Sequence, residues 1–168
     1  MFIVLSEDLI TGNAEFDRHH QHLLDTANAI AITQSPDARA KVTAGLRLIT
    51  GQAEQHFGAE EQVMEMLGCP WAAHHIRAHQ QLLEWLEQLM RSLDQGKDPA
   101  AIQLRLHHGI QRRYLTHIRQ ADGRLARWLH KRVVRLGTAV DEQMIWAQTT
   151  RIEGGLSRPR LGERHAAK

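Results

Sequence analysis

The sequence predicts an all-α protein, specifically an up-down-up-down four-helix bundle with an N-terminal arm and a C-terminal basic extension. Aromatic residues make up only 5% of the 168 residues, and runs of β-branched residues are absent. Apolar side chains instead recur at intervals of three and four residues, which is typical of amphipathic helices. Three short breaks, at 35–37, 68–70 and 95–99, divide this pattern into four segments. Short connections between long helices favour antiparallel neighbours and therefore a bundle.

The four helices are expected over about 15–33, 36–67, 71–93 and 99–129, the last reaching 135 at most. An extended arm that ends at Gly12 precedes the first helix. Pro36 disfavours helical geometry in the residue before it, and Pro99 suits the first position of a helix. The residues expected to face inward are Phe16, His20, Leu23, Leu24, Ala27, Ile30, Leu46, Ile49, Ala53, His56, Glu60, Val63, Leu67, His75, His79, Leu82, Leu86, Leu89 and Met90.

The bundle is expected to form one domain, residues 1–135, because 168 residues with 42% hydrophobic content suffice for one core. Residues 136–168 are expected to form an extension, with a short helix near 140–148 and a disordered end.

The single cysteine, Cys69, excludes an internal disulfide and suits a reducing compartment. The first residues do not resemble a signal peptide, and no stretch is long and apolar enough to span a membrane. We therefore predict a cytoplasmic protein.

Basic residues concentrate near the C-terminus, where residues 123–168 carry ten Lys or Arg and four Asp or Glu. Arg124, Arg127, Lys131 and Arg135 fall near one helical face. This stripe could contact an acidic protein partner, nucleic acid or lipid headgroups. The alternative, which we favour, is a solvated helix end that runs into a basic tail, so nucleic-acid binding is not expected.

Histidines and carboxylates recur at helical spacings on all four predicted helices. Side chains four residues apart lie on one face of a helix, so each such pair can direct two ligands at a common centre. A lone histidine on an apolar face is usually a hydrogen-bonded core residue, but several on successive helices indicate a metal site. The candidate metal ligands are His20, His56, Glu60, His75, His79, His117 and Asp122.

These seven side chains suit two iron ions better than one. If both carboxylates and one solvent-derived oxygen bridge two octahedral irons, one coordination position remains open for a small diatomic ligand. The site is richer in imidazole than the Glu-x-x-His sites of other di-iron bundles. Such a set favours lower oxidation states and reversible binding over cleavage of the O–O bond. Zinc prefers four-coordinate sites and does not require seven ligands.

The spacing from His117 to Asp122 is the exception in this pattern. Five residues along an α-helix do not place two side chains on one ideal face. Asp122 can join the other ligands only if the helix is locally unwound there, or if the two metals lie between the two side-chain directions.

Three stretches resemble the hemerythrins, and most of all their single-domain bacterial form, bacteriohemerythrin: TGNAEFDRHHQHLL, HFGAEEQVMEMLGCPWAAHHIRAH and YLTHIRQADGRLARWL. They span residues 11 to about 129. The resemblance implies His20 as a ligand rather than His19 or His22, because His20 follows Phe16 and Asp17 at the interval found in the family. The resemblance implies one coordinatively saturated iron and a second iron with an open position, joined by two carboxylates and an oxo or hydroxo bridge. The implied ligands are His75, His79 and His117 on the first iron, His20 and His56 on the second, and Glu60 and Asp122 between them.

The resemblance implies reversible O2 binding, for storage or delivery, and no enzymatic activity. A peroxidase or NO-related activity suits an imidazole-rich site less well, although NO and azide-like anions are plausible ligands. The alternative is a sensor of O2, NO or redox state that acts through the C-terminal tail and a separate protein partner. Arg113 stands where the family often has an aromatic residue near the pocket, so we expect a wetter site. The histidines expected to bind no metal are His19, His22, His74, His107, His108, His130 and His165, with His19 and His74 at the surface.

Overall fold

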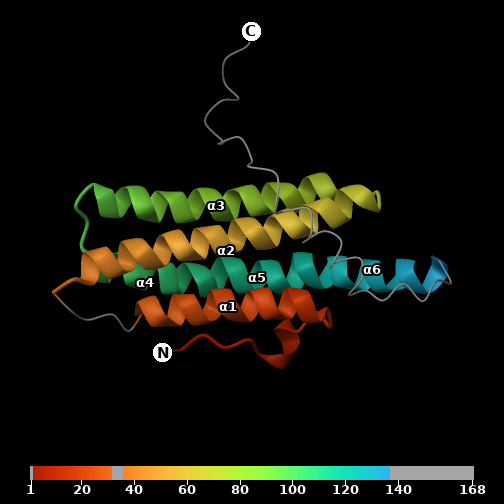
Figure 1. Cartoon of the computed structure of the whole chain (residues 1–168), viewed down its shortest axis with the longest axis horizontal. Helices are drawn as coiled ribbons and strands as arrows, with labels where there is room; N and C mark the ends of the chain where they lie inside the picture. The colour runs from red at the N-terminus through yellow and green to blue at the C-terminus, as the bar shows by residue number, and fades with distance from the viewer. Residues whose placement is uncertain (1, 32–35, 137–168) are drawn as a thin grey trace, which may run out of the picture.

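A computed structural model of the chain describes residues 2–31 and 36–136 and forms the predicted four-helix bundle (Figure 1). Three of its helices are uninterrupted, and the fourth is a single rod assembled from five consecutive helical segments. No strand occurs in the described ranges, which confirms the all-α prediction. The three single helices are α1 (Ala14–Ala31), α2 (Ala38–Met66) and α3 (Ala72–Asp94); the rod contains α4 (Pro99–Gly109), η2 (Ile110–Tyr114), α5 (Leu115–His117), η3 (Ile118–Asp122) and α6 (Gly123–Leu136).

Helix α1 packs against α2 and α4, and α3 packs against the same two helices. In each of these pairs the two helices run in opposite directions (Figure 1). Within the described part of the chain, no helix is long and apolar enough to cross a membrane. The predicted short helix near 140–148, the disordered end and the other expectations for 137–168 lie outside the described residues, as do residues 32–35. The division into residues 1–135 and 136–168 stays a prediction.

Local side-chain and glycine chemistry fixes the ends of the helices. The Asn13 side chain accepts hydrogen bonds from the backbone N–H groups of Glu15 and Phe16, both at 3.1 Å, and so caps the start of α1. At the end of α2, Gly68 adopts a left-handed conformation with φ of 63°. The Cys69 N–H then reaches back to the Met64 carbonyl at 2.8 Å, as in a Schellman motif. These contacts explain why the breaks in the sequence pattern are sharp.

The apolar core consists of two clusters, and the candidate ligands occupy positions between them along each helix. The larger cluster extends from Ile30 and Val42 to Ile118, and the smaller one gathers around Phe16, Val63 and Leu125. All the residues predicted to face inward are buried except Leu67 and Met90, which are half-buried. Apolar packing on both sides therefore holds a polar layer inside the bundle.

The N-terminal arm is tied to the bundle at two points, which confirms the predicted arm. The Asn28 side chain hydrogen-bonds the backbone of Ile3 twice, donating to its carbonyl at 2.7 Å and accepting from its N–H at 2.8 Å. A short 3₁₀ turn, η1 (Glu7–Leu9), follows. Its Asp8 accepts from the Arg119 guanidinium at 2.6 Å, so the arm also contacts η3.

Replacing Gly109 by alanine should destabilise the bundle by about 1–3 kcal/mol, because extra atoms in a packed core force neighbours to move. A Cβ atom there would lie 1.9 Å from Cζ2 of Trp85. Gly51 is the matched control, since it is exposed in α2 and a Cβ there would have nothing within 4 Å. Gly51→Ala should stabilise the protein by roughly 0.5–1 kcal/mol. Urea unfolding measures both changes, and equal effects would contradict the close approach of α3 and α4.

Candidate metal centre

The structure brings all seven predicted ligand residues into one buried layer of the bundle. The most exposed of them, His117, has only 6% of its surface accessible. They come from α1, α2, α3 and the helical rod, so every helix of the bundle contributes. In the part of the chain that the structure describes, histidines and carboxylates form two groups with ligand atoms close enough to hold a metal ion, and Asp122 belongs to both.

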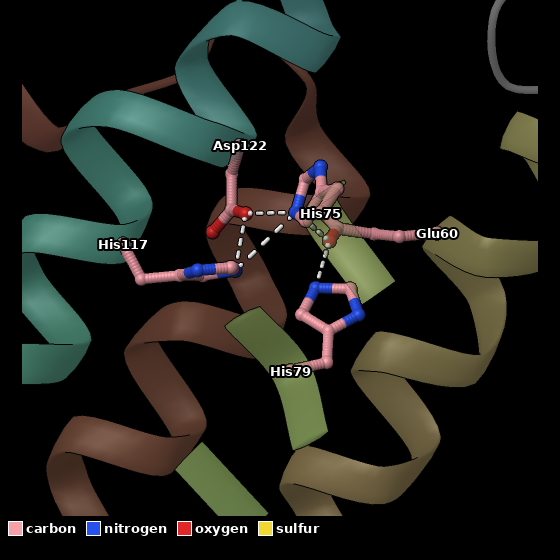
Figure 2. A group of neighbouring side chains, drawn as sticks. All are labelled: Glu60, His75, His79, His117 and Asp122. Carbon is pink, nitrogen blue, oxygen red and sulfur yellow. Dashed lines mark hydrogen bonds and ion pairs between the residues drawn. The ribbon is translucent and has the colours of Figure 1, made fainter. Parts of the chain in front are cut away.

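The first group contains Glu60, His75, His79, His117 and Asp122, whose side chains point toward one another from three helices (Figure 2). The Nε2 atom of His75 lies 3.3 Å from Oε2 of Glu60 and 3.1 Å from Oδ1 of Asp122. His79 approaches the same Glu60 oxygen at 3.1 Å, and His117 approaches the same Asp122 oxygen at 2.9 Å. Three imidazole nitrogens thus converge on one oxygen from each carboxylate.

The second group contains His20, His56 and Asp122. The Nε2 atoms of the two histidines are 3.0 Å apart. Both face Oδ2 of Asp122, His20 at 3.1 Å and His56 at 3.9 Å. His56 also lies 3.8 Å from Oε1 of Glu60.

The two oxygens of each carboxylate therefore face different sets of histidines. Oδ1 of Asp122 and Oε2 of Glu60 face the group of three histidines, whereas Oδ2 and Oε1 face the group of two. A carboxylate placed between two metal ions has this arrangement.

The residues fit a metal-bound state for a further reason, which is that Oε1 of Glu60 is buried and has no hydrogen-bond partner within residues 2–31 and 36–136. A buried, unpaired carboxylate oxygen is costly unless a cation or a donor compensates it. Neutral imidazole nitrogens that meet at 3.0 Å likewise need a shared proton or a metal ion between them.

A π-helical turn brings Asp122 onto the same side as His117. The backbone N–H of Gly123 donates to the carbonyl of Ile118, five residues earlier, and η2 contains the equivalent bond from Leu115 to Ile110. A π-turn contains one more residue than an α-turn. Two side chains five residues apart therefore lie on one face here, as two side chains four residues apart do in an α-helix. Of the two alternatives that the spacing left open, the structure therefore shows the local unwinding of the helix.

The carboxylates and histidines of the layer shift one another's pKa values. Burial raises the pKa of Asp122, but the facing histidines outweigh it and hold that pKa well below its usual range. The pKa of Glu60 is also lowered, by His56, His75 and His79, against burial and the charge of Asp122. Burial lowers the pKa of His75, but its hydrogen bonds to Asp122 and Glu60 raise it to about 9. Without a metal, the two carboxylates are thus ionised and His75 is protonated at neutral pH.

The sequence analysis missed two residues beside this layer. Glu61 accepts a hydrogen bond from Nδ1 of His79 at 3.0 Å, and such a contact orients a ligating imidazole and raises its basicity. Tyr114 is buried, and its ring centroid lies 6.0 Å from that of His20. Burial raises the pKa of Tyr114 well above its usual value, and the charges of Asp122 and Glu60 raise it further, so the phenol stays protonated. Both residues adjoin predicted ligands in the sequence, Glu61 directly and Tyr114 at a helical spacing.

Aromatic rings form the apolar wall around the histidines. Phe57 stacks on His79 with ring centroids 4.0 Å apart, and Phe16 meets His56 edge-on at 5.7 Å. Both phenylalanines are almost fully buried. They limit the access of water to the layer from the side of α1 and α2.

A surface pocket of about 460 Å³ reaches the layer from the other side, where His75 and His117 contribute to its lining. Arg113 lines this pocket and is exposed, with its guanidinium 6.0 Å from the ring of Trp85. The aromatic residue that lies buried one turn before His117 is Tyr114. The structure thus places Arg113 in the lining of the surface pocket, together with Arg112 and Arg124.

Among the described histidines, none outside the predicted ligand set joins either group, and His165 lies outside the described residues. His74 is exposed as predicted. The expectation for His19 was wrong, because its ring is half-buried and packs edge-on against His56 at 5.6 Å. Burial, followed by the positive charge of nearby histidines and Arg18, lowers the pKa of His19 to about 4. His19 therefore packs against a predicted ligand and is only partly exposed.

The metal-free protein should lose stability as pH rises from 6 to 10. The folded-state pKa of His75, about 9, exceeds its usual 6.5, so its stabilising contribution is complete below pH 6.5 and vanishes above pH 9. The loss should be on the order of 3 kcal/mol. Urea unfolding with a chelator measures it. His75→Gln should flatten the pH profile, whereas the exposed neighbour variant His74→Gln should keep it; an unchanged profile in His75→Gln would contradict the assignment.

Comparison with known proteins gives two findings. Residues 11–129 match the model of the hemerythrin HHE cation binding domain. The chain is also similar to a bacteriohemerythrin from Stenotrophomonas maltophilia (strain R551-3), with 27% identity over 120 residues, which are 71% of this chain and 76% of that protein. The matched region contains all seven residues of the buried layer.

Proposed function

The chain belongs to the hemerythrin HHE cation-binding family, and on this premise we propose that it binds O2 reversibly at two non-haem iron ions. The proposed role is storage or delivery of O2, without catalysis. The family match and the buried histidine–carboxylate cluster support metal binding. The identity of the metal as iron, the count of two, a bridging oxo or hydroxo group and a cytoplasmic location belong to the proposal.

In this proposal His75, His79 and His117 hold one iron, and His20 and His56 hold the other. Glu60 and Asp122 would contribute ligand oxygens to both ions. One observation supports this assignment: the two oxygens of Asp122 face different histidines. Its Oδ1 faces His75 and His117, and its Oδ2 faces His20 and His56. The metal with two histidines has one protein ligand fewer, so a small ligand would bind there.

When bound, the iron pair would supply the electrons that O2 takes up and returns. The residues of this chain contribute a fixed geometry and an aromatic wall beside His56 and His79. Phe16 and Phe57 shield the imidazoles from water, and exclusion of water limits the proton leakage that would release reduced oxygen species. Glu61 holds the ring of His79 in one orientation. An imidazole-rich shell of this kind favours reversible binding over oxidation of a substrate.

An anaerobic–aerobic cycle on iron-loaded protein tests the proposal. With two irons per chain, a charge-transfer band in the visible spectrum should appear with air and vanish when O2 is removed. Immediate and irreversible conversion to an oxidised spectrum would contradict reversible binding and favour the sensor or enzyme alternatives. Failure to hold two irons would contradict the ligand assignment. Deleting residues 136–168 separates carrier from sensor, since a carrier keeps its O2 affinity and a sensor loses partner binding.

A further inference from the structure

Tyr114 carries a buried polar group for which the proposed ligand set has no use. The residue is 2% exposed, and its hydroxyl has no hydrogen-bond partner among the described residues. A buried hydroxyl that lacks a partner costs free energy, so such a group calls for an explanation. The chain contains only this one tyrosine.

The position of Tyr114 relates it to one half of the metal centre. It ends the π-helical segment η2, and its ring meets that of His20 edge-on at a centroid distance of 6.0 Å. His20 is a proposed ligand of the metal that has two histidines and an open position. The charges of Asp122 and Glu60, the two carboxylates that face both groups of histidines, raise the pKa of Tyr114 in addition to its burial.

The other rings that pack on His20 and His56 supply no hydroxyl. Phe16, Phe57 and His19 all pack against His56, and none of them carries a hydroxyl. Thr116, on the same helical rod, already donates its hydroxyl to the Arg112 carbonyl at 2.8 Å. A protonated phenol is a hydrogen-bond donor, and a donor inside an apolar wall acts strongly because water does not compete.

We propose that the Tyr114 hydroxyl donates a hydrogen bond to the small ligand held on the His20–His56 side of the metal centre. This inference rests on the proposed function, since it requires an open position there. Tyr114 would then be a positioning and selectivity residue: it would strengthen the binding of ligands whose outer atom accepts a hydrogen bond, such as O2 and azide, relative to a ligand without such an acceptor.

The test uses the full-length, iron-loaded, oxidised protein with azide as the probe. Tyr114→Phe keeps the ring and removes only the hydroxyl, and Thr116→Val is the matched control on the same rod. Azide affinity is measured by titration of its visible charge-transfer band. The infrared stretching frequency of bound azide is compared in H2O and D2O, which reports a hydrogen bond independently of O2 binding. Global replacement of tyrosine by 3-fluorotyrosine changes only Tyr114 and strengthens it as a donor.

Tyr114→Phe should retain two irons, bind azide about tenfold more weakly, as expected for loss of a hydrogen bond to an anionic acceptor, and lose its part of the D2O shift. Thr116→Val should resemble the unmodified protein, and the fluorotyrosine protein should bind azide more tightly. Equal azide affinity and an equal D2O shift in Tyr114→Phe would overturn the inference and leave the proposed function intact. If the unmodified protein holds two irons but binds no azide, the open position itself is wrong and both proposals fall. Should Tyr114→Phe not fold, an unchanged azide affinity in the fluorotyrosine protein would overturn the inference.

Discussion

Replacing Asp122 by asparagine is expected to abolish loading of the two proposed metal ions. Asp122 is fully buried and is the residue common to the two groups of ligand atoms. An amide retains the size of the side chain but loses the charge and one of the two oxygens that face the histidines. Loss of a hydrogen bond to a ligand already lowers metal affinity by roughly 10–100-fold, so loss of a shared ligand should exceed that. The metal content per chain, measured after dialysis, gives the result.

Two further variants provide an intermediate effect and a control for this experiment. Glu61→Gln removes the charge of the carboxylate that accepts from Nδ1 of His79 and should weaken metal binding by roughly 10–100-fold without abolishing it. Asp25→Asn removes an exposed carboxylate on α1 and should change nothing. Circular dichroism must show that Asp122→Asn is folded, because a charge removed from a buried network can destabilise the fold. A folded Asp122→Asn variant that holds two metals would contradict the bridging role.

The sequence was most informative where side chains follow a simple period. The bundle and its inward stripes could be predicted because apolar residues repeat at the spacing of an α-helix, and capping residues such as Asn13 and Gly68 mark the ends. The seven candidate ligands fall on these stripes, so their convergence in one layer follows from the same pattern. Whether each of them ligates a metal stays a prediction that metal binding experiments must test.

The residues that were misplaced or missed depend on contacts that a period does not encode. His19 was expected at the surface because its neighbour His20 points inward, yet the ring of His19 packs edge-on against the ring of His56. Glu61 was overlooked for the same reason, since it reaches His79 from beside the stripe. The resemblance drew attention to Arg113, whereas the aromatic residue that the structure buries beside the layer is its neighbour Tyr114, at the end of the π-helical segment η2.

The π-turn itself gives the second large prediction: inserting one alanine after Arg119 should abolish metal loading, whereas deleting Gln120 should not. Gln120 is exposed and lies within η3. Deletion leaves His117 and Asp122 four residues apart, so an ordinary α-turn keeps them on one face and leaves α6 in its present orientation. Insertion instead rotates Asp122 and all of α6 by about 100°. Leu125 and Leu129, which are buried in the smaller core cluster, would also turn away from it.

Metal content and helical content of the two variants, measured side by side, decide the matter. The two changes alter the length of the chain by one residue each, at the same place, so a general intolerance of length changes predicts the same loss in both. The π-turn predicts an asymmetry, because the segment already contains one residue more than an α-helix needs. Equal loss of metal in both variants would show that the backbone bond from Gly123 to Ile118 does not align Asp122 with His117. Retention after deletion would mean that this helix holds a spare residue next to its metal ligands, a feature that π-turns often have at functional sites.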